Sequence, residues 1–149
     1  MREAGEEAPD FRLPSTEGEV SLHELSRGRK VLLAFYTEDR TPLCATEIGA
    51  LRDDFSIIQE LGAAVIGISA DSLESHRQFA EEMRLPFPLA SDAALEVARA
   101  YEALNEDGKR SRRALFVIED GRIVHAEQWF QPGNPNQYEA VFRALGFEE

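Results

Sequence analysis

Two short, continuously apolar runs limit the architecture of this chain more than any other feature. The first spans Lys30–Tyr36 and the second spans Ala63–Ser69. Each has the length and composition of a strand that is buried on both faces, as parallel strands of α/β sheets are. Between them, apolar residues recur at helical spacing from near Pro42 until Gly62 ends the pattern. This alternation predicts two parallel strands joined by an amphipathic helix.

The flanking segments add further elements. Phe11–Val20 is expected to be extended and folded about a Ser-Thr-Glu-Gly turn, and Ser21 begins a capping box that opens a short helix. After the second apolar run, a helix is expected to start at Asp71 or Ser72, one of which serves as its N-cap.

The second half of the chain predicts a helix, a hairpin and a last helix. Asp92 has the position of an N-cap for a helix whose apolar side reaches Leu104. Leu115–Glu119 and Arg122–Trp129 flank an Asp-Gly pair, which favours an antiparallel hairpin. Asn134 precedes a proline and caps the last helix. This order is that of the thioredoxin-like fold, an α/β fold with a mixed central β-sheet flanked by helices on both faces.

Length and charge limit the classes of partner. A chain of 149 residues is about the size of one globular domain, so residues 1–149 are predicted to form a single domain. Its formal net charge of -12 would repel nucleic acid and anionic membranes. No apolar run reaches the length of a membrane span, and the segment Met1–Ala8 is acidic, unlike a secretory signal. We therefore expect a cytoplasmic protein with no nucleic-acid or membrane partner.

Cys44 is the only cysteine, so the chain cannot form an internal disulfide and has no pair of cysteines two residues apart. Its three histidines are scattered and give no ligand spacing for zinc or an iron–sulfur cluster, so no metal is expected. A lone thiol is either inert packing or a reactive group. Both interpretations are open at this point.

The position of Cys44 favours reactivity. It falls in the first turn of the predicted helix, at the carboxyl end of a buried strand. The first-turn N–H groups have no intrahelical partners and carry the positive end of the helix dipole, so they favour a thiolate over a thiol. Thr41 can present its hydroxyl to the same place, while Pro42 stiffens the loop.

The residues around Cys44 resemble a known family. Phe35-Tyr36 ends the first apolar strand, and Thr41-Pro42-Leu43-Cys44 follows. Further segments also match the family: Ala8-Pro9-Asp10-Phe11, Glu47, Leu51-Arg52-Asp53 and Gly67–Asp71. The chain thus resembles the peroxiredoxins of the AhpC/TSA superfamily over nearly its whole length, and most closely the bacterioferritin-comigratory or Q-type subfamily. The resemblance implies a redox-active centre at Cys44.

The resemblance also implies an arginine at the site, and the chain departs from the family motif at one position. The family places an arginine three residues before a Phe at the start of a late strand, which matches Arg113, with neighbouring Arg112 as the alternative. The family's motif proline, which helps shield the cysteine pocket, is replaced here by Thr37. This departure bears on the rate of any peroxidase reaction.

The resemblance implies an antioxidant peroxidase with Cys44, Thr41 and Arg113 as catalytic residues. Cys44 would attack hydrogen peroxide or an organic hydroperoxide and become a sulfenic acid, without metal, haem, flavin or other cofactor. Because the chain has no second thiol, an external thiol must complete a 1-Cys cycle: thioredoxin, glutaredoxin or a low-molecular-weight thiol. A disulfide with another Cys44 or with a partner protein is the other route, and the state is expected to be a monomer or homodimer.

Two other classes of function are open. One is a thiol–disulfide oxidoreductase of another kind, although such enzymes usually need a second nearby cysteine. The other is a non-catalytic scaffold or chaperone that retains Cys44 as packing, and Thr37 is the residue that most favours it.

Overall fold

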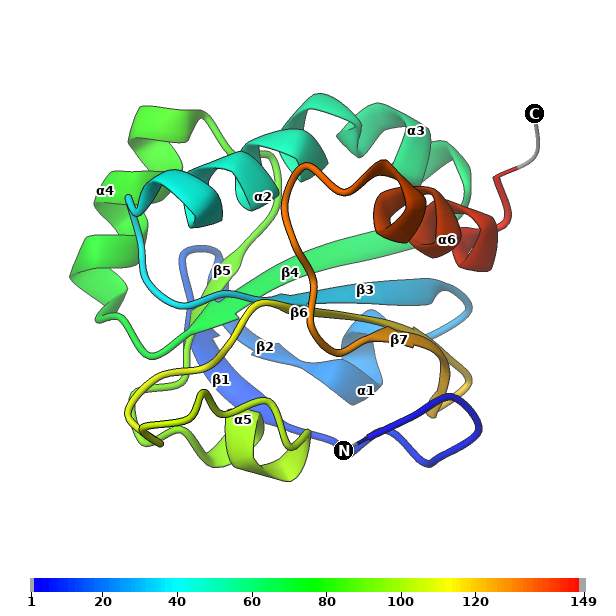
Figure 1. Ribbon diagram of the computed structural model, residues 1–149, viewed down its shortest axis with the longest axis horizontal. Helices are drawn as coiled ribbons and strands as arrows, with labels where there is room; N and C mark the ends of the chain where they lie inside the picture. The colour runs from blue at the N-terminus through cyan, green and yellow to red at the C-terminus, as the bar shows by residue number, and fades with distance from the viewer. Residues whose placement is uncertain (1, 148–149) are drawn as a thin grey trace.

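A seven-stranded mixed β-sheet forms the centre of the protein in the computed structural model, which describes residues 2–147 (Figure 1). Met1 and residues 148–149 of the predicted 1–149 domain lie outside the described range. The strands are β1 (Arg12–Ser15), β2 (Gly18–Ser21), β3 (Lys30–Phe35), β4 (Ala63–Ser69), β5 (Leu89–Ser91), β6 (Ala114–Glu119) and β7 (Arg122–Glu127). Their order across the sheet is β2-β1-β5-β4-β3-β6-β7.

Helices cover both faces of this sheet. They are α1 (Leu22–Leu25), α2 (Pro42–Asp53), α3 (Phe55–Glu60), α4 (Leu73–Met83), α5 (Glu96–Ala100) and α6 (Pro135–Leu145). α2, α3, α4 and α6 lie over one face, and α1 and α5 lie under the other (Figure 1). The predicted mixed sheet with helices on both faces is confirmed. Within residues 2–147, every helix is too short or too polar to cross a lipid bilayer.

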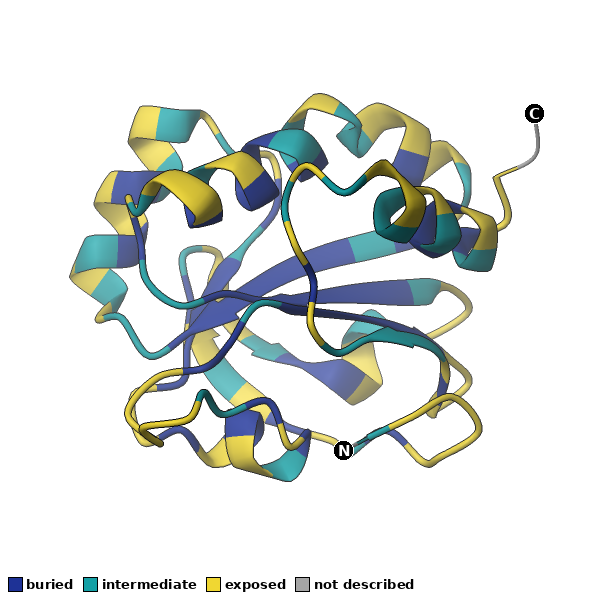
Figure 2. Ribbon diagram, in the orientation of Figure 1, coloured by how far each residue is buried: buried dark blue, intermediate teal, exposed yellow. Residues whose placement is uncertain are grey.

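β3 contributes side chains to two hydrophobic cores, one on each face of the sheet. It runs parallel to β4 and antiparallel to β6, and it is buried from Val31 to its end (Figure 2). Because successive side chains point to opposite faces, its residues divide between the two cores. Val31, Leu33 and Phe35 pack under the sheet with α5, while Leu32 and Ala34 pack against α2 and α6. The carboxyl end of β3, from which the chain enters α2, is therefore held by a neighbouring strand on each side and by a hydrophobic core on each face.

The predicted caps at Ser21 and Asn134 are confirmed. The Ser21 side chain accepts a hydrogen bond from the Glu24 N–H at 3.1 Å, and the Asn134 side chain accepts from the first turn of α6. Of the two residues predicted to start the helix after β4, Ser72 is the N-cap, and its hydroxyl accepts from the Ser75 N–H at 3.1 Å.

The single helix predicted between Pro42 and Gly62 is wrong. The chain leaves helical geometry at Asp54, which separates α2 from α3. At this break the Tyr138 hydroxyl of α6 lies 3.1 Å from the Ala50 carbonyl and 2.9 Å from Asp54 Oδ2. A side chain from another helix thus competes for groups at the end of α2, an interaction that sequence periodicity does not reveal.

The helix predicted from Asp92 through Leu104 is shorter than expected. α5 begins only after Leu95, which has left-handed backbone geometry (φ 58°), and ends before Glu102, which has it too (φ 55°). The Asp92 carboxylate nevertheless accepts from the N–H groups of Val97 and Ala98, so it caps α5 from a distance. The last predicted strand, Arg122–Trp129, ends earlier, since β7 stops at Glu127. The three-residue strand β5 was not predicted.

Candidate active site

Cys44 is the third residue of α2, directly after the loop that leaves β3. Its side chain is fully buried in the core between the sheet and α2. Complete burial is typical of a packing cysteine, whereas reactive cysteines are usually partly exposed. It also means that a peroxide reaches the sulfur only when the first turn of α2 or the side chains around it move.

The first turn of α2 has backbone donors with no acceptor inside the helix. Its first intrahelical bond runs from the Ala45 N–H to the Thr41 carbonyl at 2.8 Å, so the N–H groups of Leu43 and Cys44 come too early for an intrahelical acceptor. Thr41 is the N-cap, but its side chain makes no capping bond; its hydroxyl donates to the Glu38 carbonyl at 3.3 Å. The amides beside Cys44 are thus left to stabilise negative charge.

The pairing of β6 with β3 brings Arg113 to the site. Phe35 pairs with Ala114, so the antiparallel register places Arg113 beside the end of β3. Its Nε is buried and has no hydrogen-bond partner among the described residues. Arg113 and Thr37 line the same pocket, of about 210 Å³, together with Trp129. The residue predicted to be catalytic and the residue that replaces the motif proline therefore face one cavity.

The alternative arginine, Arg112, is held by the fold. It is buried, and its guanidinium donates to the carbonyls of Glu102, Leu104 and Gln128 at 2.5 to 3.3 Å. It also lies over the ring of Trp129, 4.5 Å from the centroid. Its Nη2 is buried without a hydrogen-bond partner, as Arg113 Nε is, but its Nε and Nη1 are engaged by these carbonyls. These contacts give Arg112 a structural role.

Glu47, one turn after Cys44 on α2, is a residue to which the sequence analysis gave no role. Its side chain is 1% exposed, and neither carboxyl oxygen has a hydrogen-bond partner among the described residues. Burial raises the pKa of Glu47 well above its ordinary value; the neighbouring Cys44 raises it further, and Arg113 opposes the shift. The shift favours the neutral acid, and its causes place Glu47 close to Cys44 and Arg113. Its spacing of three from Cys44 is the signal that could have pointed to it.

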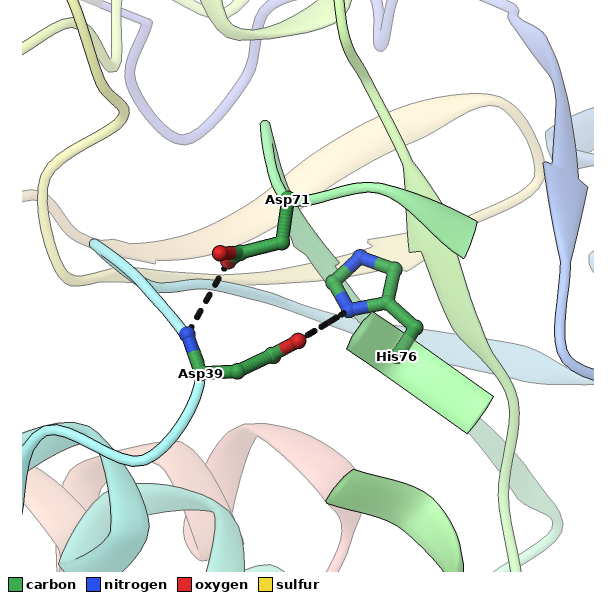
Figure 3. A group of neighbouring side chains, drawn as sticks. All are labelled: Asp39, Asp71 and His76. Atoms are coloured by element: carbon green, nitrogen blue, oxygen red, sulfur yellow. Dashed lines mark hydrogen bonds and ion pairs between the residues drawn. The ribbon is translucent and has the colours of Figure 1, made fainter. Parts of the chain in front are cut away.

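A second polar cluster, formed by Tyr36, Asp39, Asp71 and His76, lies at the carboxyl ends of β3 and β4. His76 Nδ1 lies 2.9 Å from Asp39 Oδ2, and the Asp39 N–H donates to Asp71 Oδ2 at 3.0 Å (Figure 3). The three histidines are scattered in the sequence, and His76 is fully buried. Its carboxylate partner lies 37 residues away in sequence, so no local pattern indicates the pair.

Asp39, Asp71 and His76 bring potential metal ligands within 4.8 Å of one another. Their atoms are already engaged inside the protein. His76 Nε2 bonds the Ala90 carbonyl at 3.0 Å, Nδ1 bonds Asp39, and Asp71 Oδ2 also accepts from the Ser69 hydroxyl. A cation would have to displace these bonds, so the donor set favours a hydrogen-bonded cluster over a metal centre.

Comparisons with known proteins place this geometry in a family. The model of the AhpC/TSA family matches residues 4–126. The chain belongs to the AhpC/TSA family. Peroxiredoxin Bcp of Bacillus subtilis is 34% identical over 134 residues, covering 85% of this chain and 84% of that protein. Chloroplastic peroxiredoxin Q of Sedum lineare is 36% identical over 132 residues, covering 86% and 70%.

Solved peroxiredoxin structures have the same fold. Peroxidoxin BcpB of Mycobacterium tuberculosis matches with a TM-score of 0.85 and 27% identity over 100% of both chains. The bacterioferritin comigratory protein of Xanthomonas campestris matches with a TM-score of 0.84 and 28% identity over 96% of this chain and 97% of that one. The predicted thioredoxin-like fold and the resemblance to bacterioferritin-comigratory and Q-type peroxiredoxins are confirmed.

Proposed function

We propose that this protein is a thiol-dependent peroxidase that reduces hydrogen peroxide or organic hydroperoxides at Cys44. Membership of the AhpC/TSA family and relatives named peroxiredoxin support the assignment. The observation that carries it is a thiol in a helical first turn with unpaired amides, where both Cys44 and the partly unpartnered Arg113 lie close enough to Glu47 to shift its pKa. These are the groups that stabilise a thiolate and the charge that develops on a peroxide oxygen.

In the proposed reaction, the Cys44 thiolate attacks the terminal oxygen of ROOH. The S–O bond forms as the O–O bond breaks, and the leaving oxygen takes up a proton and departs as water or an alcohol. Arg113 and the first-turn amides stabilise the negative charge on the separating oxygens. The Thr41 oxygen, whose proton points to Glu38, accepts a hydrogen bond from the hydroperoxide O–H. The reaction uses no metal, haem or flavin.

The cycle closes with external thiols, because Cys44 is the sole cysteine. One thiol condenses with the sulfenic acid to give a mixed disulfide and water, and a second thiol releases Cys44 and forms the oxidised reductant. Thioredoxin, glutaredoxin and low-molecular-weight thiols all fit this 1-Cys cycle, in a monomer or a homodimer. Dependence on reducing thiols fits a cytoplasmic location.

A non-catalytic scaffold is the second candidate, favoured by the complete burial of Cys44 and by Thr37. In that case the thiol is only packing. The third class, a thiol–disulfide oxidoreductase of another kind, has no structural observation in its favour.

Peroxide turnover separates the two candidates. Reduced protein is given one equivalent of hydrogen peroxide or an alkyl hydroperoxide, trapped with a sulfenic-acid reagent and analysed by mass spectrometry. We expect one adduct on Cys44, and continued peroxide loss when dithiothreitol, glutathione or thioredoxin is supplied. Absence of the adduct, or equal peroxide loss with Cys44→Ser, would leave only the scaffold.

A further inference from the structure

His76 lies in the first half of α4 with both ring nitrogens facing hydrogen-bond acceptors. Its side chain is fully excluded from solvent. Nε2 lies 3.0 Å from the Ala90 carbonyl oxygen of β5, which can only accept, so Nε2 carries a hydrogen. On the other side of the ring, Nδ1 lies 3.1 and 2.9 Å from the two carboxyl oxygens of Asp39 (Figure 3).

Asp39 is surrounded by donors. The Tyr36 hydroxyl donates to its Oδ1 at 2.7 Å, and the Ser75 hydroxyl donates to its Oδ2 at 2.7 Å. Burial alone would raise the pKa of Asp39, but hydrogen bonds from His76, Tyr36 and Ser75 outweigh it and hold that pKa below its ordinary value. A carboxylate held in its ionised form therefore faces Nδ1. This arrangement is satisfied when both ring nitrogens of His76 carry a hydrogen.

The other charged groups near this pair come from three segments. From the turn after β4, Asp71 accepts from the Asp39 N–H and from the Ser69 hydroxyl. From the loop before α2, Arg40 extends to α4, where it pairs with Glu82 at 2.9 Å. From the end of β3, Tyr36 also contacts the pair; burial raises its pKa well above the ordinary value, so it stays a neutral donor.

The pair anchors a strained segment. Residues 37–41 connect β3 to α2, and within them Arg40 has left-handed backbone geometry (φ 68°), which a residue with a Cβ rarely adopts. Such geometry persists only where surrounding contacts determine it. Here Asp39 is fixed through its side chain by His76 and through its N–H by Asp71, and Arg40 is fixed by Glu82. The next residue is Thr41, the N-cap of the Cys44 helix.

We propose that His76 is a positioning residue for the Cys44 reaction: its imidazolium holds Asp39, and through it the strained segment 37–41, so that Thr41 and the first turn of α2 keep their reactive placement. His76 itself touches no reacting atom. The inference rests on the proposed peroxidase function.

The charge of His76 is tested on the unaltered protein. Two-bond ¹⁵N–¹H spectra of ¹⁵N-labelled protein distinguish an imidazolium from either neutral tautomer. We expect both ring nitrogens of His76 to be protonated at pH 7. A neutral tautomer would overturn the proposal, and this outcome does not depend on any enzymatic activity.

The positioning role is tested by comparing two reactions of the same thiol. The rate constants of Cys44 with hydrogen peroxide and with iodoacetamide are measured for wild type, His76→Gln and Asp39→Asn. His125→Gln is the matched control, because His125 also pairs with a carboxylate, Glu127 at 2.9 Å, outside this cluster. Alkylation needs only an accessible thiolate, whereas the peroxide reaction also needs aligned donors. We expect the peroxide rate to fall about tenfold or more in both cluster variants, with a change below about threefold in alkylation.

Equal changes in both rates, or none, would overturn the positioning role, since loosened packing alone would alter both reactions alike. If His76→Gln does not fold, as judged by circular dichroism, Asp39→Asn and Tyr36→Phe supply the same comparison. A wild-type peroxide rate no greater than that of free cysteine would instead contradict the proposed function, while leaving the charge measurement valid. The two failures are therefore distinguishable.

Discussion

The Ser111 hydroxyl donates a 2.6 Å hydrogen bond to the Tyr36 carbonyl, and both residues are buried. Tyr36 is the residue at which β3 gives way to the loop that leads to Cys44, and Ser111 lies two residues before Arg113. This bond therefore joins the segment that carries the thiol to the segment that carries its arginine. Loss of the bond changes the relative placement of the two.

Ser111→Ala is expected to lower both stability and peroxide rate. A buried carbonyl that loses its donor costs about 1–3 kcal/mol, and the looser placement of Arg113 lowers the peroxide rate several-fold. Urea denaturation and stopped-flow kinetics measure the two effects. Ser26→Ala is the control, because the exposed Ser26 hydroxyl also bonds a carbonyl and should cost less than about 0.5 kcal/mol. Equal losses in the free energy of unfolding of the two variants would show that burial does not increase the contribution of the Ser111–Tyr36 bond.

Substitutions of the two adjacent arginines are expected to have different effects, one mainly on the peroxide rate and the other mainly on stability. Arg113→Ala removes a donor at the site and should lower the peroxide rate about 100-fold, with little change in the unfolding midpoint. Arg112→Lys cannot satisfy three carbonyls and the Trp129 face, and should cost about 2–3 kcal/mol of stability with a smaller effect on rate. The reverse pattern would move the catalytic assignment to Arg112.

Glu47→Gln is expected to show that the buried carboxyl is neutral. Because the folded-state pKa of Glu47 is raised, the folded protein binds a proton that the unfolded chain releases as pH rises past about 4.3. The wild type thus loses stability from this group with increasing pH, by up to about 1.4 kcal/mol per unit. Gln does not titrate, so the advantage of the variant over wild type should grow as pH rises above about 4.3. The free energies of unfolding from urea titrations at each pH measure this.

The same substitution tests whether the carboxyl takes part in chemistry. A glutamine keeps the size and the neutral state, so we expect the peroxide rate at pH 7 to stay within about threefold of wild type. Glu139→Gln on the exposed side of α6 is the control for both measurements. A pH-independent stability difference would mean that Glu47 is ionised in the folded protein.

Thr37→Pro is expected to raise the peroxide rate. The Thr37 N–H makes no hydrogen bond with another described residue, so a proline removes no donor in use, and it stiffens the wall of the pocket that Arg113 shares. We expect an increase of several-fold in stopped-flow kinetics with the fold retained. Thr37→Ala, which removes the hydroxyl without adding the ring, should not show it. A slower Thr37→Pro enzyme would indicate that the threonine hydroxyl is itself useful.

The sequence was sufficient for local features and insufficient for features that depend on distant segments. The strands at Lys30–Phe35 and Ala63–Ser69 carry their burial in their own composition, and the caps at Ser21 and Asn134 act within three residues. The break at Asp54 coincides with hydrogen bonds from Tyr138 of the last helix, and β5 is too short to show a pattern. Neither can be recognised from a window of sequence.

The residues of the candidate site also divide into those that local sequence predicts and those that depend on distant segments. The position of Cys44 and Thr41 at the start of α2 follows from one continuous segment, and Arg113 was placed by family resemblance and then by strand register. The pairing of Asp39 with His76 joins a loop to a helix across 37 residues. The pKa of Asp39 depends on its burial and on these contacts, which the sequence does not give for single polar residues.

The most direct test is the single-turnover rate constant of reduced Cys44 with hydrogen peroxide, measured by stopped flow beside free cysteine at the same pH. Several aligned donors at the thiolate should make Cys44 at least about a thousandfold faster than free cysteine, with the product mass one oxygen heavier on that residue. A rate equal to that of free cysteine, unchanged by Arg113→Ala, would contradict the account and leave Cys44 as a packing residue.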